Sequence, residues 1–279
     1  MNIHFLNGSL VEEDELLISP RDLGYLRGYS IFEFLRTYSG GKPFMLKRHV
    51  DRLYNSAEAI GMLLPWDKAQ IIEWVQYTLN ANDTNVEKVI RIIISGGVSH
   101  TFSLAETPTI IIMIDDVVAL PKKYYENGVN AYLVEHKRYK PMAKTTSYID
   151  AIYFCQTYKI RDVDEIIYHK HNIILEGHRS NVFVVTKDKL ITPKTDILGG
   201  ITRGVLLEIL DIDKPVVVDD VSVEDLYNAE EVFVTASAKE IMPITKINTK
   251  NIGAGTVGPI TRQVIHQFKE YVSSNKWWN

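Results

Sequence analysis

One lysine in this chain lies in a stretch whose residue types suit covalent chemistry. Lys144 comes three positions after Pro141, and Thr145 to Ser147 and then Tyr148 follow it. An amine that is held away from water loses its charge and becomes a nucleophile, so a lysine here could anchor an aldehyde cofactor. Taken alone, a lysine is most often a solvated surface charge. The covalent interpretation therefore depends on partners elsewhere in the chain.

An acidic residue ends an apolar segment later in the chain. Glu176 follows the run Ile173 to Leu175 and precedes Gly177. A carboxylate at the end of a buried strand is costly unless a cation meets it. A protonated pyridine nitrogen would be such a cation, and a structural salt bridge is the alternative.

Three further groups of residues suit a phosphate. Residues 199–203 (Gly-Gly-Ile-Thr-Arg) are expected where a loop enters a helix, and free backbone amides at a helix N-terminus favour an anion. Residues 235–238 (Thr-Ala-Ser-Ala) end an apolar strand and could complete a phosphate cup. Arg52 could add a bidentate contact, although Arg48 and Arg52 could equally be solvated on an exposed helix face. Tyr148 could bond a phenolate oxygen beside the lysine.

The composition bounds the class of protein. The 279 residues include 46% hydrophobic and 24% charged residues, which fits a soluble globular protein of two ordinary domains. The net charge of -4 gives no reason to expect a nucleic-acid partner. The single cysteine, Cys155, excludes an internal disulfide, suits a reducing compartment and is expected to be a buried structural thiol. No metal site is predicted.

The chain has neither a signal-peptide pattern at its start nor an apolar run of about 20 residues, the length that spans a bilayer. We therefore expect a cytoplasmic protein with no membrane partner.

Hydrophobic periodicity predicts two domains. We expect an N-terminal α/β domain over residues 1–117, a polar, proline-containing linker over 118–124 and a C-terminal domain over 125–279. The first domain has predicted strands at 3–6, 10–11, 31–38, 89–95 and 109–114, helices at 45–60 and 68–79, and a glycine-containing tight loop at 23–30. The second has predicted helices at 147–160, 198–210, 223–227 and 261–272 and a meander of short strands at 130–135, 165–168, 173–175, 182–185, 190–192, 216–218 and 232–235.

The order of the motifs resembles the class IV aminotransferases, which are the fold-type IV pyridoxal-phosphate enzymes. This family includes branched-chain aminotransferases, D-amino acid aminotransferases and aminodeoxychorismate lyases. The resemblance extends roughly from Asn7 to Phe268. The matching motifs are His49-x-x-Arg52-Leu53, Lys144 with Tyr148, Glu176-Gly177-x-x-Ser180-Asn181, Gly200-Ile201-Thr202-Arg203 and Phe233-Val234-Thr235-x-Ser237.

The resemblance implies a mixed α/β fold with a smaller N-terminal domain and a larger C-terminal domain whose core is β-barrel-like. It implies pyridoxal 5′-phosphate between the domains, in a homodimer. By resemblance, Lys144 is the Schiff-base lysine that also carries the proton, Glu176 is the partner of the pyridine nitrogen that keeps the ring an electron sink, and Tyr148 lies beside the phenolic oxygen. The remaining implied cofactor contacts are Arg52, Ser180, Asn181, Ile201, Thr202, Ala236 and Ser237.

The substrate-side residues depart from the family's usual patterns. Phe32-Glu33 resembles a pair in the branched-chain enzymes, but Phe34 follows where they have glycine. Arg91 matches an arginine of those enzymes, and Arg27 stands where they usually have tyrosine. D-amino acid aminotransferases carry an arginine-histidine pair in a loop for which residues 96–102 offer only His100, and Arg179 replaces a small residue.

We expect Phe32, Arg27, Arg91 and Arg179 on the substrate side, because an arginine fork binds a carboxylate through two parallel hydrogen bonds. Arg27, from the same or a neighbouring subunit, and Arg91 would hold the α-carboxylate. The predicted reaction is transfer of the amino group of a D-amino acid or a branched-chain amino acid to a 2-oxo acid. The alternatives are an aminodeoxychorismate lyase, which releases pyruvate and 4-aminobenzoate, and a non-catalytic homologue that binds the cofactor.

Overall fold

Strands with alternating buried and half-buried residues form a sheet in the first part of the chain. In the part of the chain that is described, this sheet has six strands in the order β2-β1-β6-β5-β3-β4, and all neighbours are antiparallel. The strands are β1 (His4–Leu6), β2 (Ser9–Val11), β3 (Ser30–Tyr38), β4 (Lys42–Pro43), β5 (Lys88–Ser95) and β6 (Thr109–Asp116).

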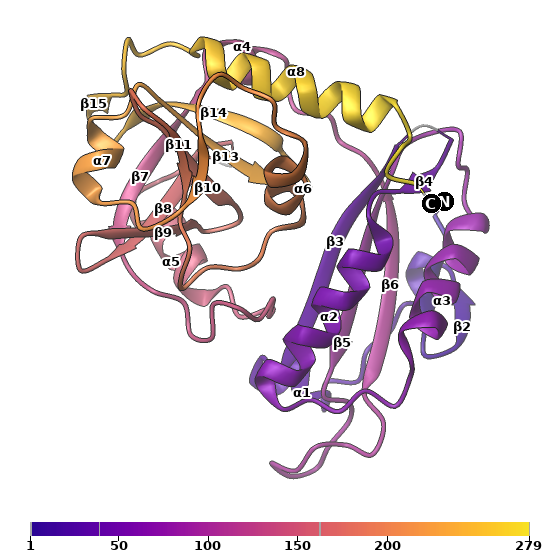
Figure 1. Ribbon diagram of the computed structural model, residues 1–279. Coiled ribbons are helices and arrows are strands. Elements are labelled where there is room, and N and C mark those ends of the chain that lie inside the picture. Colours follow the sequence, from indigo (N-terminus) through magenta and orange to yellow (C-terminus); the bar gives the residue numbers. More distant parts are fainter. Residues whose placement is uncertain (1, 39, 162, 279) are drawn as a thin grey trace. The chain divides into compact units, whose positions relative to one another are not determined.

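Two helices, α2 (Leu46–Ile60) and α3 (Lys68–Asn80), cover one face of this sheet (Figure 1). Because successive side chains of a strand point to opposite faces, Ile31 and Leu35 of β3 meet this helical layer, whereas Phe32 and Phe34 face away from it. The core between sheet and helices contains Ile31, Leu35, Val50, Leu53, Ile71, Val75, Ile90, Ile92 and Ile94.

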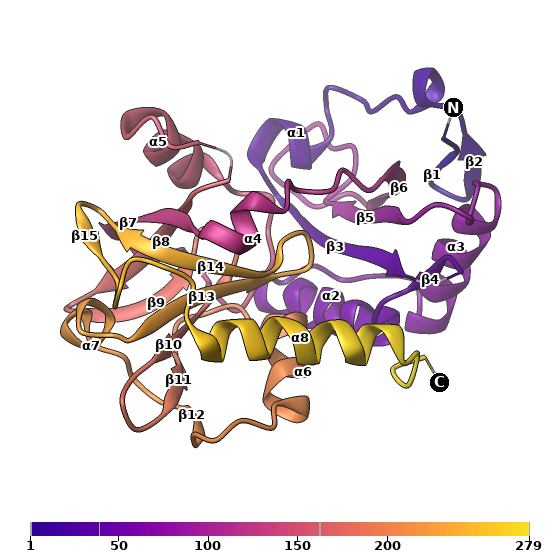
Figure 2. The ribbon, with the colours of Figure 1, turned by 90° about the horizontal axis from the view of Figure 1, so that it is seen from above.

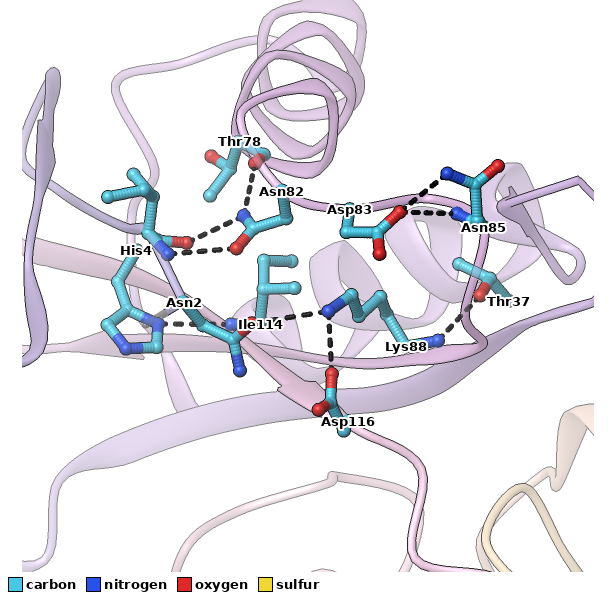
Figure 3. A network of polar contacts seen from close by, with 11 residues as sticks. Asn2, His4, Thr37, Thr78, Asn82, Asp83, Asn85, Lys88, Ile114 and Asp116 are labelled. Atoms are coloured by element: carbon cyan, nitrogen blue, oxygen red, sulfur yellow. Dashed lines mark hydrogen bonds and ion pairs between the residues drawn. The ribbon is translucent and has the colours of Figure 1, made fainter.

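A partly buried polar network holds one end of the sheet (Figure 3). Lys88 is 3% exposed, and its ammonium nitrogen lies 2.6 Å from Oδ1 of Asp116 and 3.2 Å from Oδ1 of Asn2. The Lys88 backbone N–H donates to Oγ1 of Thr37 at 2.8 Å. The charge of Lys88 is thus balanced at the sheet end, away from the residues with predicted chemistry.

Short strands build a second, strongly curled sheet. Within the described residues it has nine strands, in the order β12-β11-β10-β13-β14-β7-β8-β9, with β15 beside β14. The end strand β9 also contacts β10, so the sheet curls back on itself (Figure 2). The strands are β7 (Val129–Glu135), β8 (Glu165–Lys170), β9 (Ile173–Gly177), β10 (Asn181–Val185), β11 (Leu190–Thr192), β12 (Val216–Val218), β13 (Glu231–Ala236), β14 (Glu240–Ile247) and β15 (Lys250–Asn251).

The helices of this second part lie around the curled sheet. They are α4 (Lys123–Asn127), α5 (Ile149–Thr157), α6 (Ile201–Ile209), α7 (Val223–Tyr227) and α8 (Pro259–Ser273). The first turn of α8 is capped from the sheet, because the buried carboxylate of Glu231 accepts from the N–H groups of Ile260 at 3.0 Å and Thr261 at 2.7 Å.

The computed structural model describes residues 2–38, 40–161 and 163–278, and these divide into two compact units. One unit comprises Met1–Val118, Ala143–Tyr148 and Asn275–Asn279, and the other Ala119–Met142 and Ile149–Ser274. The segment that contains Lys144 therefore lies with the first unit, whereas the expected boundaries count it with the second domain.

Local structure differs from expectation in several places. Helix α4 and strands β4 and β15 were not predicted, and Cys155, expected to be a buried thiol, is half-buried. Residues 23–30 were expected to be a loop, but helix α1 (Leu23–Arg27) forms there, because the side chain of Asp22 accepts from the N–H of Gly24 at 2.7 Å. Helix α5 begins at Ile149 and not at 147, since the residues before it pair with β3. Strand β14 was not predicted, because Pro243 in its middle argues against a central strand.

Among the described residues, no helix combines the length and the apolar character that crossing a membrane requires.

Candidate active site

The segment that contains Lys144 pairs with the edge of β3. The N–H of Phe32 donates to the carbonyl of Lys144 at 2.9 Å, and the N–H of Thr146 donates to the carbonyl of Ser30 at 3.1 Å. On the other side, the N–H of Lys144 donates to Oγ of Ser56 on α2 at 3.0 Å. The backbone around the lysine is therefore held by both a strand and a helix, which restricts where its side chain can reach.

An aromatic ring lies against the lysine amine. The Nζ atom of Lys144 is 4.2 Å from the centroid of the Phe32 ring, and the Tyr148 ring lies 5.9 Å from that ring at an angle of 63°. The amine and the phenol expected beside a cofactor thus flank the same phenylalanine. The structure brings these three predicted site residues together.

A buried ion pair orients Arg52. Its Nε and Nη2 donate to the two carboxylate oxygens of Glu33, each at 2.7 Å, and Nδ1 of His49 lies 2.7 Å from Oε2 of the same carboxylate. His49, Arg52 and Ser56 are spaced by three and four positions, so they lie on one face of α2. The same helix face therefore supports both the Lys144 backbone and the guanidinium expected to bind phosphate.

The charges in this cluster are balanced. Burial raises the pKa of Glu33, but the charge and hydrogen bonds of Arg52, with the bond to His49, outweigh it and lower the pKa to about 2. Burial lowers the pKa of His49, so its imidazole is neutral at pH 7 and donates through Nδ1. Among the described residues, its buried Nε2 has no hydrogen-bond partner. Glu33 therefore remains ionised beside the cation of Arg52.

Glu33 was not among the predicted site residues, although Phe32-Glu33 resembles a pair of the branched-chain enzymes. The alternation of β3 could have identified it, because Glu33 lies between Ile31 and Leu35 on the buried face of the strand. A carboxylate at such a position needs a cation nearby.

The predicted substrate arginines occupy different surroundings. Arg91 pairs with Phe34 across β3 and β5, and its Cζ atom lies 5.5 Å from that ring. Phe32 and Phe34 share a face, so Arg91 lies on the face that Lys144 contacts. Arg27 is exposed at the end of α1, where its Cζ atom lies 5.2 Å from the Phe102 ring.

In the second unit, Glu176 accepts hydrogen bonds from a side chain and from the backbone. Its Oε1 accepts from Nε of Arg138 at 2.7 Å, and its Oε2 accepts from the N–H of Leu198 at 2.8 Å. The structural salt bridge considered for this residue is thus present, with Arg138. A carboxylate with two donors can still accept a third, so this ion pair is compatible with a pyridine nitrogen as a further partner.

Asn181 joins the elements expected around the phosphate. It pairs with Thr235 where β10 begins and β13 ends, and its Nδ2 donates to the carbonyl of Leu198 at 2.8 Å. A Cβ atom on Gly200 would lie 1.9 Å from Oδ1 of Asn181, so only glycine permits this approach. Helix α6, which begins at Ile201, packs against β13. The first turn of α6 therefore lies near the turn that follows β13.

This arrangement fits a phosphate in three respects. The N-cap residue of α6, Gly200, has no side chain that could cap the helix, whereas Glu231 caps α8. Ile201 and Thr202 are its first two residues, so their N–H groups have no acceptor within the helix. Among the described residues, the buried hydroxyl of Thr235 has no hydrogen-bond partner. The small residues Ala236 and Ser237 follow it directly.

Two further predicted site residues, Ser180 and Arg179, interact with the buried carboxylate of Glu165. The hydroxyl of Ser180 donates to Oε2 of the buried Glu165 at 2.8 Å. Burial raises the pKa of Glu165, but His178 and Lys239 outweigh it and hold the pKa well below its usual range. This ionised cluster supports the turn that follows Glu176. Arg179 in that turn is exposed, and its charge also favours ionised Glu165.

The fold and these two groups of residues define a class of enzyme, the fold-type IV enzymes that use pyridoxal phosphate. The chain belongs to the amino-transferase class IV family, whose model matches residues 30–247. It is a pyridoxal-phosphate-dependent aminotransferase, and the predicted family and mixed α/β fold class are confirmed.

Two relatives match nearly the whole chain. A protein assigned provisionally as a branched-chain-amino-acid aminotransferase, from Methanocaldococcus jannaschii, is 32% identical over 98% of this chain and 96% of its own length. A D-alanine aminotransferase from Staphylococcus epidermidis is 32% identical over 97% of this chain and 98% of its own. The crystal structure of the branched-chain aminotransferase from Thermoproteus uzoniensis with norvaline superposes with a TM-score of 0.88 at 27% identity, covering 99% of this chain and 96% of that one.

Acidification should weaken the fold through Glu33. Its pKa lies below the ordinary 4.5, so its contribution is complete above pH 4.5 and is lost as the pH falls toward 2. The difference corresponds to about 3 kcal/mol. The free energy of unfolding in urea should decline less between pH 7 and pH 3 in Glu33→Gln than in the unchanged protein. Glu87→Gln, at the half-exposed partner of Arg36, should keep the original pH dependence. Equal pH dependence in Glu33→Gln would contradict this assignment.

The hydroxyl of Thr235 should serve the cofactor and not the fold. Thr235→Val removes an unpaired buried hydroxyl, so the thermal unfolding midpoint of the apoprotein should stay level or rise, while pyridoxal phosphate should bind about 5- to 10-fold more weakly. Thr192→Val is the matched control, because that hydroxyl donates to the Val182 carbonyl and accepts from Arg203, each at 2.9 Å. The control should lower the midpoint. A lowered midpoint with unchanged cofactor affinity in Thr235→Val would refute the idea.

Proposed function

We propose that this aminotransferase moves the amino group of a D-amino acid or a branched-chain L-amino acid to a 2-oxo acid, with pyridoxal 5′-phosphate held by the residues described above. The observation that supports this most directly is the position of Lys144 in a chain of the class IV aminotransferase family. Lys144 lies on a strand edge, and its amine is 4.2 Å from the centroid of the Phe32 ring.

The proposed roles follow from the chemistry of each side chain. Lys144 would hold the cofactor through its aldehyde, and when the amine is free it would carry the proton of the substrate's α-carbon. Tyr148 donates to the phenolic oxygen. Glu176 pairs with the ring nitrogen, and the bound cofactor supplies the electron sink that stabilises negative charge at the α-carbon. The proposed phosphate contacts are Arg52, Ile201, Thr202, Ala236 and Ser237, with Asn181 holding the entry to α6.

Arg91 is the proposed anchor for the substrate carboxylate. It lies on the sheet face of Phe32, and Phe34 packs against its guanidinium. A restrained guanidinium loses less freedom when it binds a carboxylate. Arg27 and Arg179 are proposed as further cations on the substrate side. Both kinds of donor remain in the proposal, since one 32% identical relative is a D-alanine enzyme and another is assigned to branched-chain amino acids.

We also propose a cytoplasmic homodimer that uses no nucleic acid or membrane. Large apolar side chains on the first unit support an interface between copies. Tyr25 is 78% exposed and Phe102 is 85% exposed, and single copies rarely leave clusters of such residues in water.

The donor can be identified from half-reactions. The purified holoenzyme should absorb visible light, and its spectrum should change with D-amino acids or with branched-chain L-amino acids in a panel of both. Lys144→Ala should lose covalent attachment of the cofactor, measured by reduction with borohydride and mass spectrometry. A colourless protein that cannot be reconstituted with pyridoxal phosphate would refute the proposal, and a spectrum that no amino acid changes would indicate a non-catalytic homologue.

One alternative reaction has specific support. Several arginines would suit aminodeoxychorismate, which has two carboxylates, and a lyase would release pyruvate and 4-aminobenzoate from it. Incubation with an amino acid and 2-oxoglutarate separates the reactions. Exchange of the amino group supports the transferase, and pyruvate release from aminodeoxychorismate without exchange supports the lyase.

Loss of a carboxylate anchor should appear as weaker substrate binding. Arg91→Ala and Arg27→Ala should each raise the KM for the amino donor by about 10-fold or more, since a charge-assisted hydrogen bond contributes about 1.5–3 kcal/mol. Arg21→Ala is the control, because Arg21 is an exposed arginine with no predicted role in substrate binding. Its Nη1 lies 3.4 Å from Nδ1 of His100. Unchanged affinity in both Arg27→Ala and Arg91→Ala would eliminate them as carboxylate anchors.

A further inference from the structure

We propose that Arg138 is a positioning residue of the cofactor site, which holds Glu176 in the orientation that meets the ring nitrogen. The inference rests on the proposed function, because it takes Glu176 as the partner of that nitrogen. Nothing in the motif pattern singled out Arg138, which lies outside the five motifs quoted for the family resemblance.

The hydrogen bonds of Arg138 hold its guanidinium beside Glu176. Its Nε donates to Oε1 of Glu176 at 2.7 Å, and its Nη2 donates to the carbonyl of Pro141 at 2.5 Å. The side chain of Arg138 is 18% exposed and that of Glu176 is 5% exposed, so water screens this pair weakly. Pro141 lies three positions before Lys144 in the chain. The bond to the Pro141 carbonyl therefore fixes the plane of the guanidinium that holds Glu176.

The sheet brings these residues together. Arg138 follows the end of β7, which pairs in parallel with β8, and the N–H of His136 extends this pairing to the carbonyl of His169 at 3.0 Å. Strand β8 pairs with β9, and Glu176 lies near the end of β9. Because β7, β8 and β9 are successive neighbours, a side chain that leaves the end of β7 can reach Glu176 across β8. The charge of Arg138 also acts on Tyr168 of β8, which lies between them.

The same carboxylate holds the loop that enters α6. Oε2 of Glu176 accepts from the N–H of Leu198 at 2.8 Å, and the Leu198 carbonyl accepts from Asn181 at 2.8 Å. Lys137, the neighbour of Arg138, pairs with Asp196 of that loop at 2.7 Å. The orientation of Glu176 is therefore coupled to the approach of the chain to the first turn of α6.

Electrostatics explains why an arginine is needed here. A nearly buried carboxylate requires a cation, and here Oε1 of Glu176 accepts from Arg138 while Oε2 accepts from Leu198. Without Arg138, Glu176 would lose this counter-charge and the bond that holds its Oε1. Its alignment with the ring nitrogen would then have to be established when the cofactor binds, at the expense of affinity.

The test compares the dissociation constants of two ligands for the apoprotein, which is prepared by refolding or by removing the cofactor. One is pyridoxal phosphate, and the other is the analogue in which C–H replaces the ring nitrogen, so that Glu176 has no nitrogen to meet. Arg138→Met should weaken binding of pyridoxal phosphate by about 10- to 100-fold, the usual effect of losing a group that orients a ligand-binding residue. It should change the dissociation constant of the analogue less than about 3-fold, because the lost alignment concerns only the nitrogen.

Variants separate this role from general stability. Glu176→Gln with Arg138→Met should bind pyridoxal phosphate no more weakly than Glu176→Gln alone, since Arg138 acts through Glu176. Arg138→Lys keeps the charge without the planar fork, so its dissociation constant for pyridoxal phosphate should lie between those of the unchanged protein and Arg138→Met. This variant keeps the test possible if Arg138→Met does not fold. Arg161→Met is the matched control, because Arg161 makes a bidentate pair with Asp164 at 2.8 and 2.7 Å. It should leave the affinity for both ligands unchanged.

The outcomes distinguish this inference from the proposed function. If the unchanged apoprotein fails to bind pyridoxal phosphate, the proposed function is wrong, and this inference falls with it. If the unchanged apoprotein binds but Arg138→Met and Arg138→Lys bind equally well, only the role of Arg138 is refuted. Equal weakening of both ligands by Arg138→Met would also refute it, because that result indicates a structural role.

Discussion

The pairing of residues 144–146 with the edge of β3 is the constraint on which the first group of site residues depends. A lysine on a free loop would be solvated and could not keep one position. Here the carbonyl of Lys144 accepts from Phe32, and its N–H donates to Ser56. The hydroxyl of Ser56 in turn donates to the carbonyl of Arg52 at 2.8 Å. Strand β3 and helix α2 thus hold Lys144, the proposed reactive amine, and Arg52, the proposed phosphate contact, in one unit.

Buried charges impose a second constraint in both units. Glu33, Glu165 and Glu176 are nearly excluded from water, and each is matched by a cation, Arg52, Lys239 and Arg138 respectively. Each carboxylate also accepts further hydrogen bonds from its surroundings. Such pairs add little net stability compared with apolar packing, but they define directions that apolar contacts cannot. We infer that these pairs are retained because they orient the groups used in binding.

The region proposed for the phosphate differs, because backbone N–H groups at the start of α6 have no acceptor within the helix. Where α8 begins, Glu231 satisfies the first N–H groups, and the helix needs no ligand. Where α6 begins, the N-cap residue Gly200 has no side chain to do so, and the nearby hydroxyl of Thr235 has no partner among the described residues. Unsatisfied donors at a helix start cost free energy that an anion can recover. The difference between the two helices accounts for why one carries a proposed binding role and the other only supports the sheet.

The sequence by itself determined the family, the mixed α/β class, most helices and strands, and Lys144, Glu176 and the α6 entry as residues of interest. These follow from local periodicity and from motif order, which need no long-range information. Only the tertiary structure revealed Glu33 beneath Arg52, Arg138 beside Glu176 and the unpaired hydroxyl of Thr235. Glu33 and Arg52 lie 19 positions apart, and Arg138 and Glu176 lie 38 apart. Such partners meet only because strands and helices distant in sequence become neighbours, and no local pattern encodes which cation will reach which carboxylate.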